Sequence, residues 1–292
     1  MSDSAASLRR KIASAGELES VVRTMKAMAA SGIGQYENAV HSLEDYYRTV
    51  QLGLAACFRH SGPARAEPKD AGAIGAIVFG SDQGLVGQFN DVMAEFVVDT
   101  LGKLPGKKTV WAVGERIQFR LADTDMQQGE QFILPSSISA ITPLVGQILV
   151  EIEKYRGQNG NGQIYLFHNR PHSGAIYIPV SQRLLPLDEA WRRDLVAIRW
   201  PTKNLPEVMN DRDKTLRALV REYLFVSLFR ACAESLASEN SSRLAAMQRA
   251  EKNIDELLEN LNQTFHRLRQ NDIDEELFDV VSGFEALTTT QG

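Results

Sequence analysis

One stretch of the chain has the residue types and the position of a ligand-binding loop. Residues 80–90 read GSDQGLVGQFN, and they follow an apolar run and precede a helix-like segment, where phosphate-binding turns occur. Its polar or flexible positions are Ser81, Asp82, Gln83, Gly84 and Asn90. The stretch is neither G-x-G-x-x-G nor a P-loop, because the Gly-Lys-Ser/Thr ending is missing. We therefore favour a tight strand-to-helix turn, capped by Asn90 or Asp91, over a nucleotide site.

The other polar groups do not assemble an active site. His168 and His172 stand in the motif HNRPH, where Pro171 argues against a helix that would align both rings on a metal. A loop after a strand is the favoured interpretation there. Ser81 has no evident histidine base or oxyanion partner. These observations favour a mechanical or interaction protein over an enzyme.

Two charge clusters remain, and each has a plain and a functional interpretation. The acidic cluster near the C-terminus consists of Asp272, Asp274, Glu275 and Glu276. On a helix it forms a solvated face or a docking surface for basic residues, rather than an acid/base pair. The basic cluster near the N-terminus consists of Arg9, Arg10, Lys11, Arg23 and Lys26. A solvated face is the default for it, and contact with an acidic partner is the alternative.

Composition bounds the class of protein. The 292 residues are 43% hydrophobic and 24% charged, enough for one large domain or two smaller ones. A formal net charge of -5 argues against nucleic acid as the main partner. Cys57 and Cys232 match no metal spacing, and we expect them to stay reduced in a cytosolic setting. Because no run of about 18 apolar residues occurs, we expect no membrane span.

Both ends of the chain predict long helices. Residues 211–287 contain no proline and one glycine, Gly283, and the seam Met247, Ile254, Leu258, Leu261, Phe265 and Leu268 follows a heptad, with Ile273, Leu277, Val280, Phe284 and Leu287 resuming it. Residues 7–58 carry a second seam through Leu8, Ile12, Ala15, Leu18, Val22, Met25 and Ala29. We expect bending near Ile33, between Gly32 and Gly34.

The two helices should pair antiparallel, because both connect to one central region. The C-terminal helix is longer by roughly 20–25 residues, or about 30–37 Å. That overhang has no partner in the chain. Its apolar positions Phe278, Val281, Phe284 and Leu287 would need another protein to cover them.

The central region alternates strand-like and helix-like segments. Strand-like runs lie at 73–79, 109–113, 163–168 and 175–180, with 182–187 as a possible continuation, and helix-like runs lie at 91–101, 115–121 and 138–155. Residues 191–210 are interpreted as a last strand or arm. The predicted fold class is α/β plus a long antiparallel coiled coil, with a Rossmann-like domain, mainly parallel with an antiparallel addition, inserted between paired terminal helices. The expected domains are 1–60, 73–205 and 206–292, with a linker at 61–72.

Three segments then resemble one family, the gamma subunit of F-type ATP synthases. The C-terminal SLASENSSRLAAM and ELFDVVSG runs, the N-terminal LRRKIAS…VVRTMKAMAAS run and the central SDQGLVGQFN run appear in the family's order. The resemblance implies a central rotor shaft without nucleotide, cofactor or metal, and without chemistry of its own. Its implied partners are the α and β subunits of the catalytic ring, the epsilon subunit and the membrane c-ring. The implied location is the cytoplasmic face of the bacterial inner membrane, as a peripheral subunit.

The resemblance also assigns subunit contacts. Met25 and Lys26 match the step that faces the β-subunit levers, and Arg269 and Gln270 match the pair that engages a β-subunit catch loop. Asp274 and Glu275 replace the family's Thr and Gln, and Phe284 and Leu287 belong to the tip that sits in the bearing of the ring. Ser81, Asp82 and Asn90 match the turn of the α/β foot domain.

Departures from the family's pattern suggest a divergent gamma subunit. Gln83, Val86 and Gln88 stand where the family has Arg, Cys and Gly, and residues 32–36 replace a basic run. These changes suggest an alternative F-type ATPase that mainly hydrolyses ATP or pumps Na⁺. The sequence leaves two other hypotheses open: a coiled-coil adaptor with an α/β head, unrelated to ATP, and a nucleotide-binding α/β protein that uses the turn at 80–87.

Overall fold

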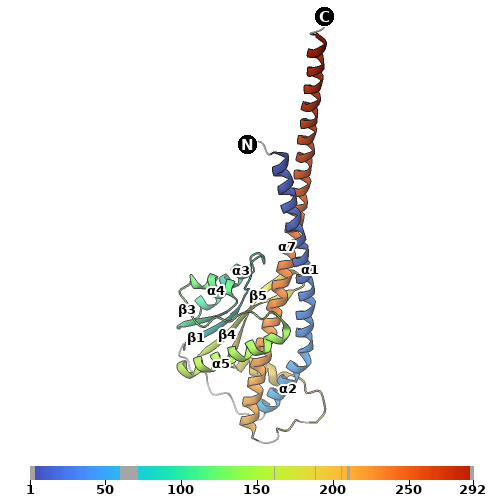
Figure 1. Ribbon diagram of the computed structural model, residues 1–292. Helices are drawn as coiled ribbons and strands as arrows, with labels where there is room; N and C mark the ends of the chain where they lie inside the picture. Colours follow the sequence, from blue (N-terminus) through green and yellow to red (C-terminus); the bar gives the residue numbers. More distant parts are fainter. Residues whose placement is uncertain are drawn as a thin grey trace. The chain divides into compact units, whose positions relative to one another are not determined.

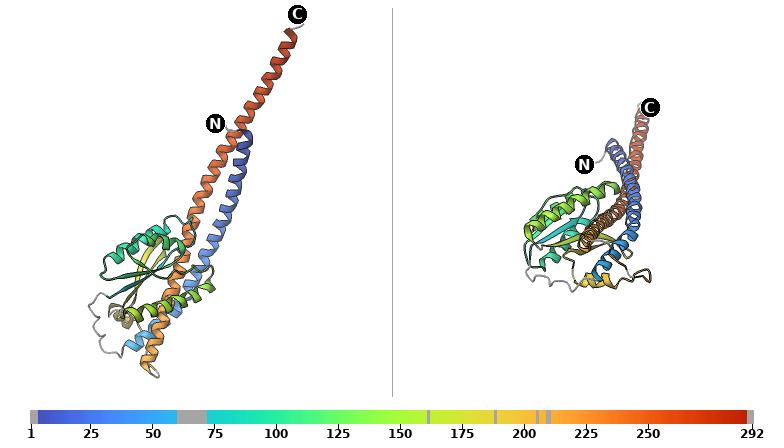
Figure 2. Two further views of the ribbon diagram at one scale, coloured as in Figure 1. Left: turned by 60° about the vertical axis from the view of Figure 1, so that its left-hand side comes forward. Right: turned by 90° about the horizontal axis from the view of Figure 1, so that it is seen from below.

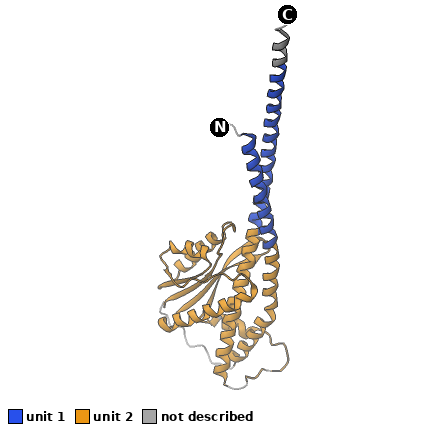
Figure 3. Cartoon of the chain, viewed as in Figure 1, with its two compact units in different colours: residues 1–28, 244–292 blue, residues 29–243 orange. Residues whose placement is uncertain are grey.

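The computed structural model describes most of the chain. The described residues are 4–59, 72–160, 162–187, 189–204, 206–208 and 211–289, without the side chains of residues 190 and 283–289. The chain forms two compact units, one of residues 1–28 with 244–292 and one of residues 29–243 (Figure 3). The expected linker at 61–72 lies outside the described residues except for Gly72. The domain boundaries expected from the sequence remain a prediction.

The larger unit is built on a five-stranded sheet (Figure 1). Its strands are β1 (Ile74–Phe79), β2 (Lys108–Val113), β3 (Gln127–Gln128), β4 (Gln163–His172) and β5 (Ala175–Leu185), in the order β3-β2-β1-β4-β5. The first four are parallel, and β5 joins β4 antiparallel. The expected fold class, a mainly parallel sheet with an antiparallel addition, is confirmed.

Helices cover both faces of this sheet (Figure 2), which is why β1 is buried at all six positions. One face packs against α3 (Phe89–Gly102) and α4 (Glu115–Ala122) through residues such as Met93, Val97 and Ile117. The other face packs against α5 (Ile141–Asn159), which follows the short η1 (Ile138–Ala140), and against the long helix α7 (Arg212–Thr289). One face of the sheet therefore supplies an apolar surface on which part of α7 packs.

The segment before α7 differs from the expected strand or arm. Residues 189–197 form helix α6 (Glu189–Ala197), so that prediction was wrong. The aromatic ring of Trp191 packs edge-on against Phe58 and Tyr223, at centroid distances of 6.2 and 4.9 Å. A helical turn presents this large side chain to two neighbouring helices at once, which the local sequence pattern did not reveal.

The N-terminal helical region is divided at Leu43. Helix α1 (Ala5–Ser42) continues through Gly32 and Gly34, and α2 (Glu44–Arg59) begins after Leu43. A Cβ on Gly32 would lie 3.1 Å from the side chain of Asn240 on α7. The glycine therefore permits close approach of the two helices. The bending expected near Ile33 stays a prediction.

Helix α7 runs unbroken over 78 residues, which confirms the prediction of a C-terminal helix from residue 211. Asp211 caps it, because its Oδ1 accepts the N–H groups of Asp213 and Lys214 at 3.0 and 3.3 Å. No helix in the described part of the chain is both apolar enough and long enough to cross a bilayer.

The smaller unit is an antiparallel helix pair. Arg9 of α1 lies over the ring of Phe265, and Lys26, farther along α1, contacts Glu251, earlier in α7. Leu8, Ala15 and Val22 are buried at intervals of seven, and the α7 seam from Met247 to Leu268 is buried or half-buried. The antiparallel pairing and the expected α7 seam over residues 247–268 are confirmed, whereas Ile273, Leu277 and Val280, which were expected to resume the seam, are exposed.

One seam position of α1 was wrong. Leu18 is 56% exposed, and half-buried Glu19 lies on the inward face instead. The inward-facing positions include those four residues after Leu8, Ala15 and Val22. A long polar side chain can lie along this face of the helix with its charged end in water.

Candidate functional site

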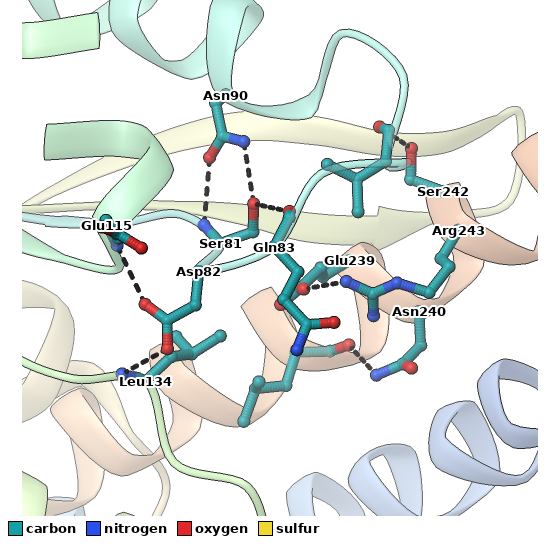
Figure 4. Close-up of polar contacts among 12 residues, drawn as sticks. Ser81, Asp82, Gln83, Asn90, Glu115, Leu134, Glu239, Asn240, Ser242 and Arg243 are labelled. Atoms are coloured by element: carbon teal, nitrogen blue, oxygen red, sulfur yellow. Dashed lines mark hydrogen bonds and ion pairs between the residues drawn. The ribbon is translucent and has the colours of Figure 1, made fainter. Parts of the chain in front are cut away.

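Ser81 and Asn90 form the closed centre of the turn at residues 80–90 (Figure 4). The Oδ1 atom of Asn90 accepts the Ser81 N–H at 3.0 Å, and its Nδ2 donates to the Ser81 Oγ at 2.8 Å. The hydroxyl of Ser81 in turn donates to the carbonyl of Gln83 at 2.9 Å. Both side chains are buried and use their polar atoms on each other. The turn is therefore a self-contained structural element, and Ser81 is not presented as a nucleophile.

Asp82 links the turn to the rest of the α/β fold. Its Oδ1 accepts the N–H of Glu115, at the start of α4, at 2.9 Å, and its Oδ2 accepts the N–H of Leu134 at 3.2 Å. A carboxylate at a helix N-terminus is stabilised by the helix dipole. Gln83 is exposed and Gly84 is half-buried. Asp82 thus holds two loops at the carboxyl edge of the sheet.

The expected cap of α3 was wrong. The N-cap position of α3 is Gln88, without a side-chain cap bond, and Asn90 lies in the first turn of the helix. The amide of Asn90 reaches back to Ser81 and is no longer available to a backbone N–H of its own helix. Gly80 leaves room for the Asn90 amide, because a Cβ there would lie 2.8 Å from Asn90 Oδ1 and 2.3 Å from the Cβ of Ile117.

A cavity of about 240 Å³ lies elsewhere in the same unit. It is lined by residues at the amino ends of β1 and β2 and on α5, among them Lys107, Thr109, Glu151 and Tyr155. Nucleotides bind open α/β sheets at the carboxyl ends of the strands. This cavity is at the opposite ends, so it does not complete a nucleotide site around the turn.

The turn is bonded to α7 through backbone atoms. Ser242 donates its hydroxyl to the carbonyl of Val86 at 2.6 Å (Figure 4). Asn169 of β4 donates its Nδ2 to the carbonyl of Phe89 at 3.3 Å, and Ser238 of α7 donates to the carbonyl of Asn169 at 3.1 Å. The turn, β4 and α7 are therefore joined by one chain of buried hydrogen bonds.

Glu234 is the charged centre of this contact. Its Oε2 lies 2.7 Å from Nε2 of His168 and 2.8 Å from Nε of Arg170, both on β4, and its Oε1 accepts from Nε of Arg230 at 2.7 Å. Burial alone would raise the pKa of this carboxyl, but His168 and the two arginines lower its pKa to about 2. Glu234 is thus ionised across the physiological range.

His168 is the neutral member of this cluster. It is 2% exposed, and burial lowers its pKa below the usual range, with Arg170 and Arg230 adding to the shift and Glu234 opposing it. The neutral ring donates from Nε2 to the Glu234 carboxylate. His172 is exposed and accepts the N–H of Gly174 at Nδ1, at 3.1 Å. The two histidines therefore have separate roles.

The loop interpretation of HNRPH was wrong, because β4 extends through His172. Within the described residues, no group of three or more His, Cys, Asp or Glu side chains could hold a metal ion. His168 is instead committed to the carboxylate of Glu234, a partner 66 residues away that sequence spacing could not identify.

A second buried ion pair lies one turn farther along α7. Glu239 accepts from Nη2 of Arg243 at 2.5 Å, and both side chains are largely buried. Burial raises the pKa of Glu239, while Arg243 opposes that shift. Asn240, next to this pair, faces Gly32 of α1. This part of α7 therefore carries buried charge.

Lys26, one of the expected subunit contacts, has a partner in its own chain. Its Nζ lies 2.6 Å from Oε2 of Glu251, and Arg23 lies 3.4 Å from the other carboxylate oxygen. The hydrogen bond from Lys26 lowers the pKa of Glu251. The Lys26 side chain is still 37% exposed, and Met25 is half-buried. The contact of Met25 and Lys26 with another chain stays a prediction.

The remaining expected contacts lie on the last part of α7. Every side chain from 269 to 282, here called the tip segment, is exposed. It contains Arg269, Gln270, Asp274 and Glu275, together with five exposed large apolar residues: Ile273, Leu277, Phe278, Val280 and Val281. The side chains of Phe284 and Leu287 lie outside the described residues. The site roles of all these residues remain predictions.

The polar residues of α7 that bind the α/β fold were missed by sequence reasoning. Glu234, Ser238 and Ser242 recur at intervals of four along the helix. That spacing puts them along one side of a helix, which was a usable signal. Their partners could not be foreseen, because those of Glu234 and Ser238 on β4 are 66 and 69 residues earlier in the chain, and that of Ser242, Val86, is 156 residues earlier.

The comparisons with known proteins agree with the fold. Residues 4–287 match the family described as ATP synthase. A curated ATP synthase gamma chain from Polynucleobacter asymbioticus is 26% identical over 290 residues, covering 96% of this chain and 98% of the relative. Another, from Clostridium perfringens strain 13, is 26% identical over 293 residues, covering 96% of each.

Solved structures share the architecture at low identity. The chain is similar to one in the Euglena gracilis mitochondrial ATP synthase, OSCP/F1/c-ring, with a TM-score of 0.67, 14% identity and coverage of 98% and 95%. It is also similar to one in the central stalk/c-ring of the Tetrahymena thermophila mitochondrial ATP synthase, with a TM-score of 0.58, 19% identity and coverage of 79% and 99%. At these identities the likeness shows the fold.

The described chain thus combines an α/β fold with a long antiparallel helix pair. Because the family match spans nearly the whole sequence, the chain belongs to the ATP synthase family, and its expected kinship with F-type gamma chains is confirmed. A gamma chain is a non-catalytic, peripheral subunit of that membrane complex. The adaptor hypothesis, unrelated to ATP, has no support from these comparisons.

Proposed function

We propose that this chain is the rotor shaft that couples ion flow through a membrane c-ring to ATP synthesis or hydrolysis in a catalytic ring of α and β subunits. The observation that carries the proposal is the tip segment, where fourteen consecutive positions (269–282) are exposed on an unbroken helix. Five of its side chains are large and apolar. A monomer rarely leaves such a surface uncovered.

The proposed partners divide along the chain. The tip segment is covered by the α and β subunits, with Arg269, Gln270, Asp274 and Glu275 among the contacts, and Phe284 and Leu287 continue that surface. Met25 and Lys26 of α1 face the β subunits at another position along the helix pair. The α/β unit rests with the epsilon subunit on the c-ring, at the cytoplasmic face of the bacterial inner membrane. The matched structures support this arrangement, since their descriptions name a central stalk and a c-ring.

The mechanism requires only differential contact. A rigid, asymmetric helix pair presents a different side to each of three catalytic sites as it turns. A site responds only if the shaft binds one of its conformations better than another. Binding free energy at the ring and ion movement at the membrane are then linked through one rotating body.

A matched pair of substitutions tests the proposal. Phe278→Asp and Asn271→Asp add the same charge to the same exposed segment, but only the first removes an apolar side chain. In the complete complex in vesicles, we expect Phe278→Asp to reduce ATP-driven ion pumping and retention of the chain with α and β, and Asn271→Asp to leave both nearly unchanged. A wild-type chain that purifies as a stable monomer without α and β would overturn the proposal.

We also propose that the complex is an alternative, Na⁺-type F-ATPase. The support is the sequence's departure from the family's usual residues, including Gln83, Val86 and Asp274. Measurement of ATP hydrolysis with and without Na⁺, across pH, tests this narrower proposal. Hydrolysis that is indifferent to Na⁺ at every pH would contradict it and leave the shaft function intact.

A further inference from the structure

Three buried polar side chains on α7 form what we call the polar ladder: Glu234, Ser238 and Ser242. They are 4%, 0% and 6% exposed. Each binds a different part of the α/β fold: the side chains of His168 and Arg170, the carbonyl of Asn169, and the carbonyl of Val86. Residues four apart lie on neighbouring turns of one helix side. The ladder therefore attaches α7 to β4 and to the turn over two helical turns.

This part of α7 also makes apolar contacts with the face of the sheet that α5 covers, and nearer the start of the helix the Tyr223 hydroxyl accepts a hydrogen bond from Gln182 of β5. Leu228, Cys232 and Leu236 belong to the core on that face. Apolar burial is non-directional and depends on the area removed from water. Close packing of the buried side chains resists both separation and rotation of the helix, but it does not by itself fix one bonded partner for each position. Hydrogen bonds weaken steeply with distance and angle, and those to charged groups are the strongest. The ladder supplies the directional contacts that apolar packing lacks.

The buried carboxylate of Glu234 selects an arrangement of α7 in addition to stabilising the fold. A buried ion pair often contributes no more stability than apolar residues of similar volume, and its best-attested use is to select one arrangement among alternatives. Here Glu234 is fully committed, with three charged or ring N–H partners at 2.7–2.8 Å. Two of these partners, His168 and Arg170, come from β4. The cluster thus specifies one rotational setting of α7 against the sheet.

We propose that Glu234, supported by Ser238 and Ser242, is the positioning residue through which torque passes between the α/β fold and α7. The inference rests on the proposed shaft function. A torque applied to the α/β fold turns α7 without slippage when the helix is fixed to the sheet by directional bonds as well as by apolar packing. Since α7 continues unbroken to Thr289, a helix held at residues 234–242 carries the rotation along its whole length.

Glu234→Gln keeps the shape of the side chain and removes its charge. In vesicles that contain the complete complex, ATP hydrolysis and ATP-driven ion pumping are measured together. We expect hydrolysis to persist while the number of ions pumped per ATP falls, and Glu234→Asp to restore part of the ratio. A pumping ratio equal to that of the wild type would overturn the proposal.

Leu236→Ala is the matched structural control. Leu236 lies on the same helix, is 4% exposed and belongs to the apolar core. We expect it to lower the thermal stability of the complex at an unchanged pumping ratio. If Leu236→Ala lowers the ratio as much as Glu234→Gln at equal loss of stability, the ladder has only a structural role and the proposal fails.

Single-bond variants cover the case in which Glu234→Gln does not assemble. Ser238→Ala and Ser242→Ala each remove one hydrogen bond, and each should lower the ratio by a smaller amount. Unchanged ratios in both would overturn the proposal. If the wild-type complex hydrolyses ATP without pumping, the shaft function itself fails and the ladder proposal fails with it. Normal pumping in the wild type and in all variants contradicts the proposal about the polar ladder and leaves the shaft function intact.

Discussion

Two segments of α7, built from similar helix-forming residues, lie in opposite environments. From 231 to 239 every side chain is buried, and from 269 to 282 every side chain is exposed. A helix buried on all sides is surrounded by its own fold, whereas one exposed on all sides is stable only with a partner or through its covalent continuation. In the first segment, polar side chains inside the fold make specific bonds. In the second, apolar side chains face water. The contrast indicates that one helix serves two structures, the α/β fold and a surface outside this chain.

The largest effect is expected in the part of α7 that is buried in the α/β fold. Leu228→Ala removes a fully buried side chain and should destabilise the fold by about 2–5 kcal/mol, because the cavity adds to the lost transfer energy. Leu277→Ala, at a position 63% exposed, should change stability by less than about 0.5 kcal/mol. Denaturant unfolding of the two variants measures both. Equal losses would mean that the tip segment packs within the chain.

Acid should weaken the buried segment through Glu234. Its folded pKa of about 2 lies below the usual value of 4.5, so the stabilisation is complete above pH 4.5 and is lost as the pH falls toward 2. A shift of that size corresponds to about 3 kcal/mol at most. Unfolding measured between pH 7 and 3 should show a shallower fall in Glu234→Gln than in the wild type. The exposed-site control Glu275→Gln should follow the wild type.

Protonation of His168 should also lower the stability of the fold, at a milder acidity than Glu234. Its pKa is lowered in the folded state, so the unfolded chain binds the extra proton first, and stability decreases as the pH falls below about 6.5. His168→Gln should remove this part of the pH dependence, as measured by thermal unfolding from pH 8 to 5. An unchanged slope in that window would contradict the assignment of a neutral ring.

The helix pair of the smaller unit should respond less than the core. Leu261→Asp places a charge on a half-buried seam position and should unpair the helices there, at a cost of about 1–3 kcal/mol. Glu259→Asp, two positions earlier on the exposed side, is its control. Amide hydrogen exchange in α1 and α7 reports the opening. Normal protection and normal coupling in Leu261→Asp would show that the register is wrong.

The smallest effect belongs to the exposed ion pair between the helices. Lys26→Ala removes the contact with Glu251, and surface pairs of this kind contribute little because water screens them. We expect a slight loss of thermal stability at low salt and none at high salt. A loss that persists in high salt would show that Lys26 contributes through packing of its aliphatic chain rather than through its charge.

The local sequence pattern was sufficient to predict the helices and strands, but it was insufficient to predict which residues contact one another. The α7 seam, the strand runs and the turn at residues 80–90 could be predicted because periodicity and glycine placement are local properties. Leu18 and the arm at 191–210 were mispredicted. For the arm, contacts from other parts of the chain decided the outcome, such as Tyr223 beside Trp191.

The sequence by itself determined that an α/β fold is inserted between two long helices and that the C-terminal helix is longer than the N-terminal one. Helix length and heptad spacing can be predicted because they depend on consecutive residues. Only the tertiary structure decided what the polar residues do. Asn90 reaches back to Ser81 instead of capping a helix, and His168 binds Glu234 instead of a metal. Burial makes an unpaired polar group costly, so each such residue takes the partner that the fold brings to it, and that partner can lie anywhere in the chain.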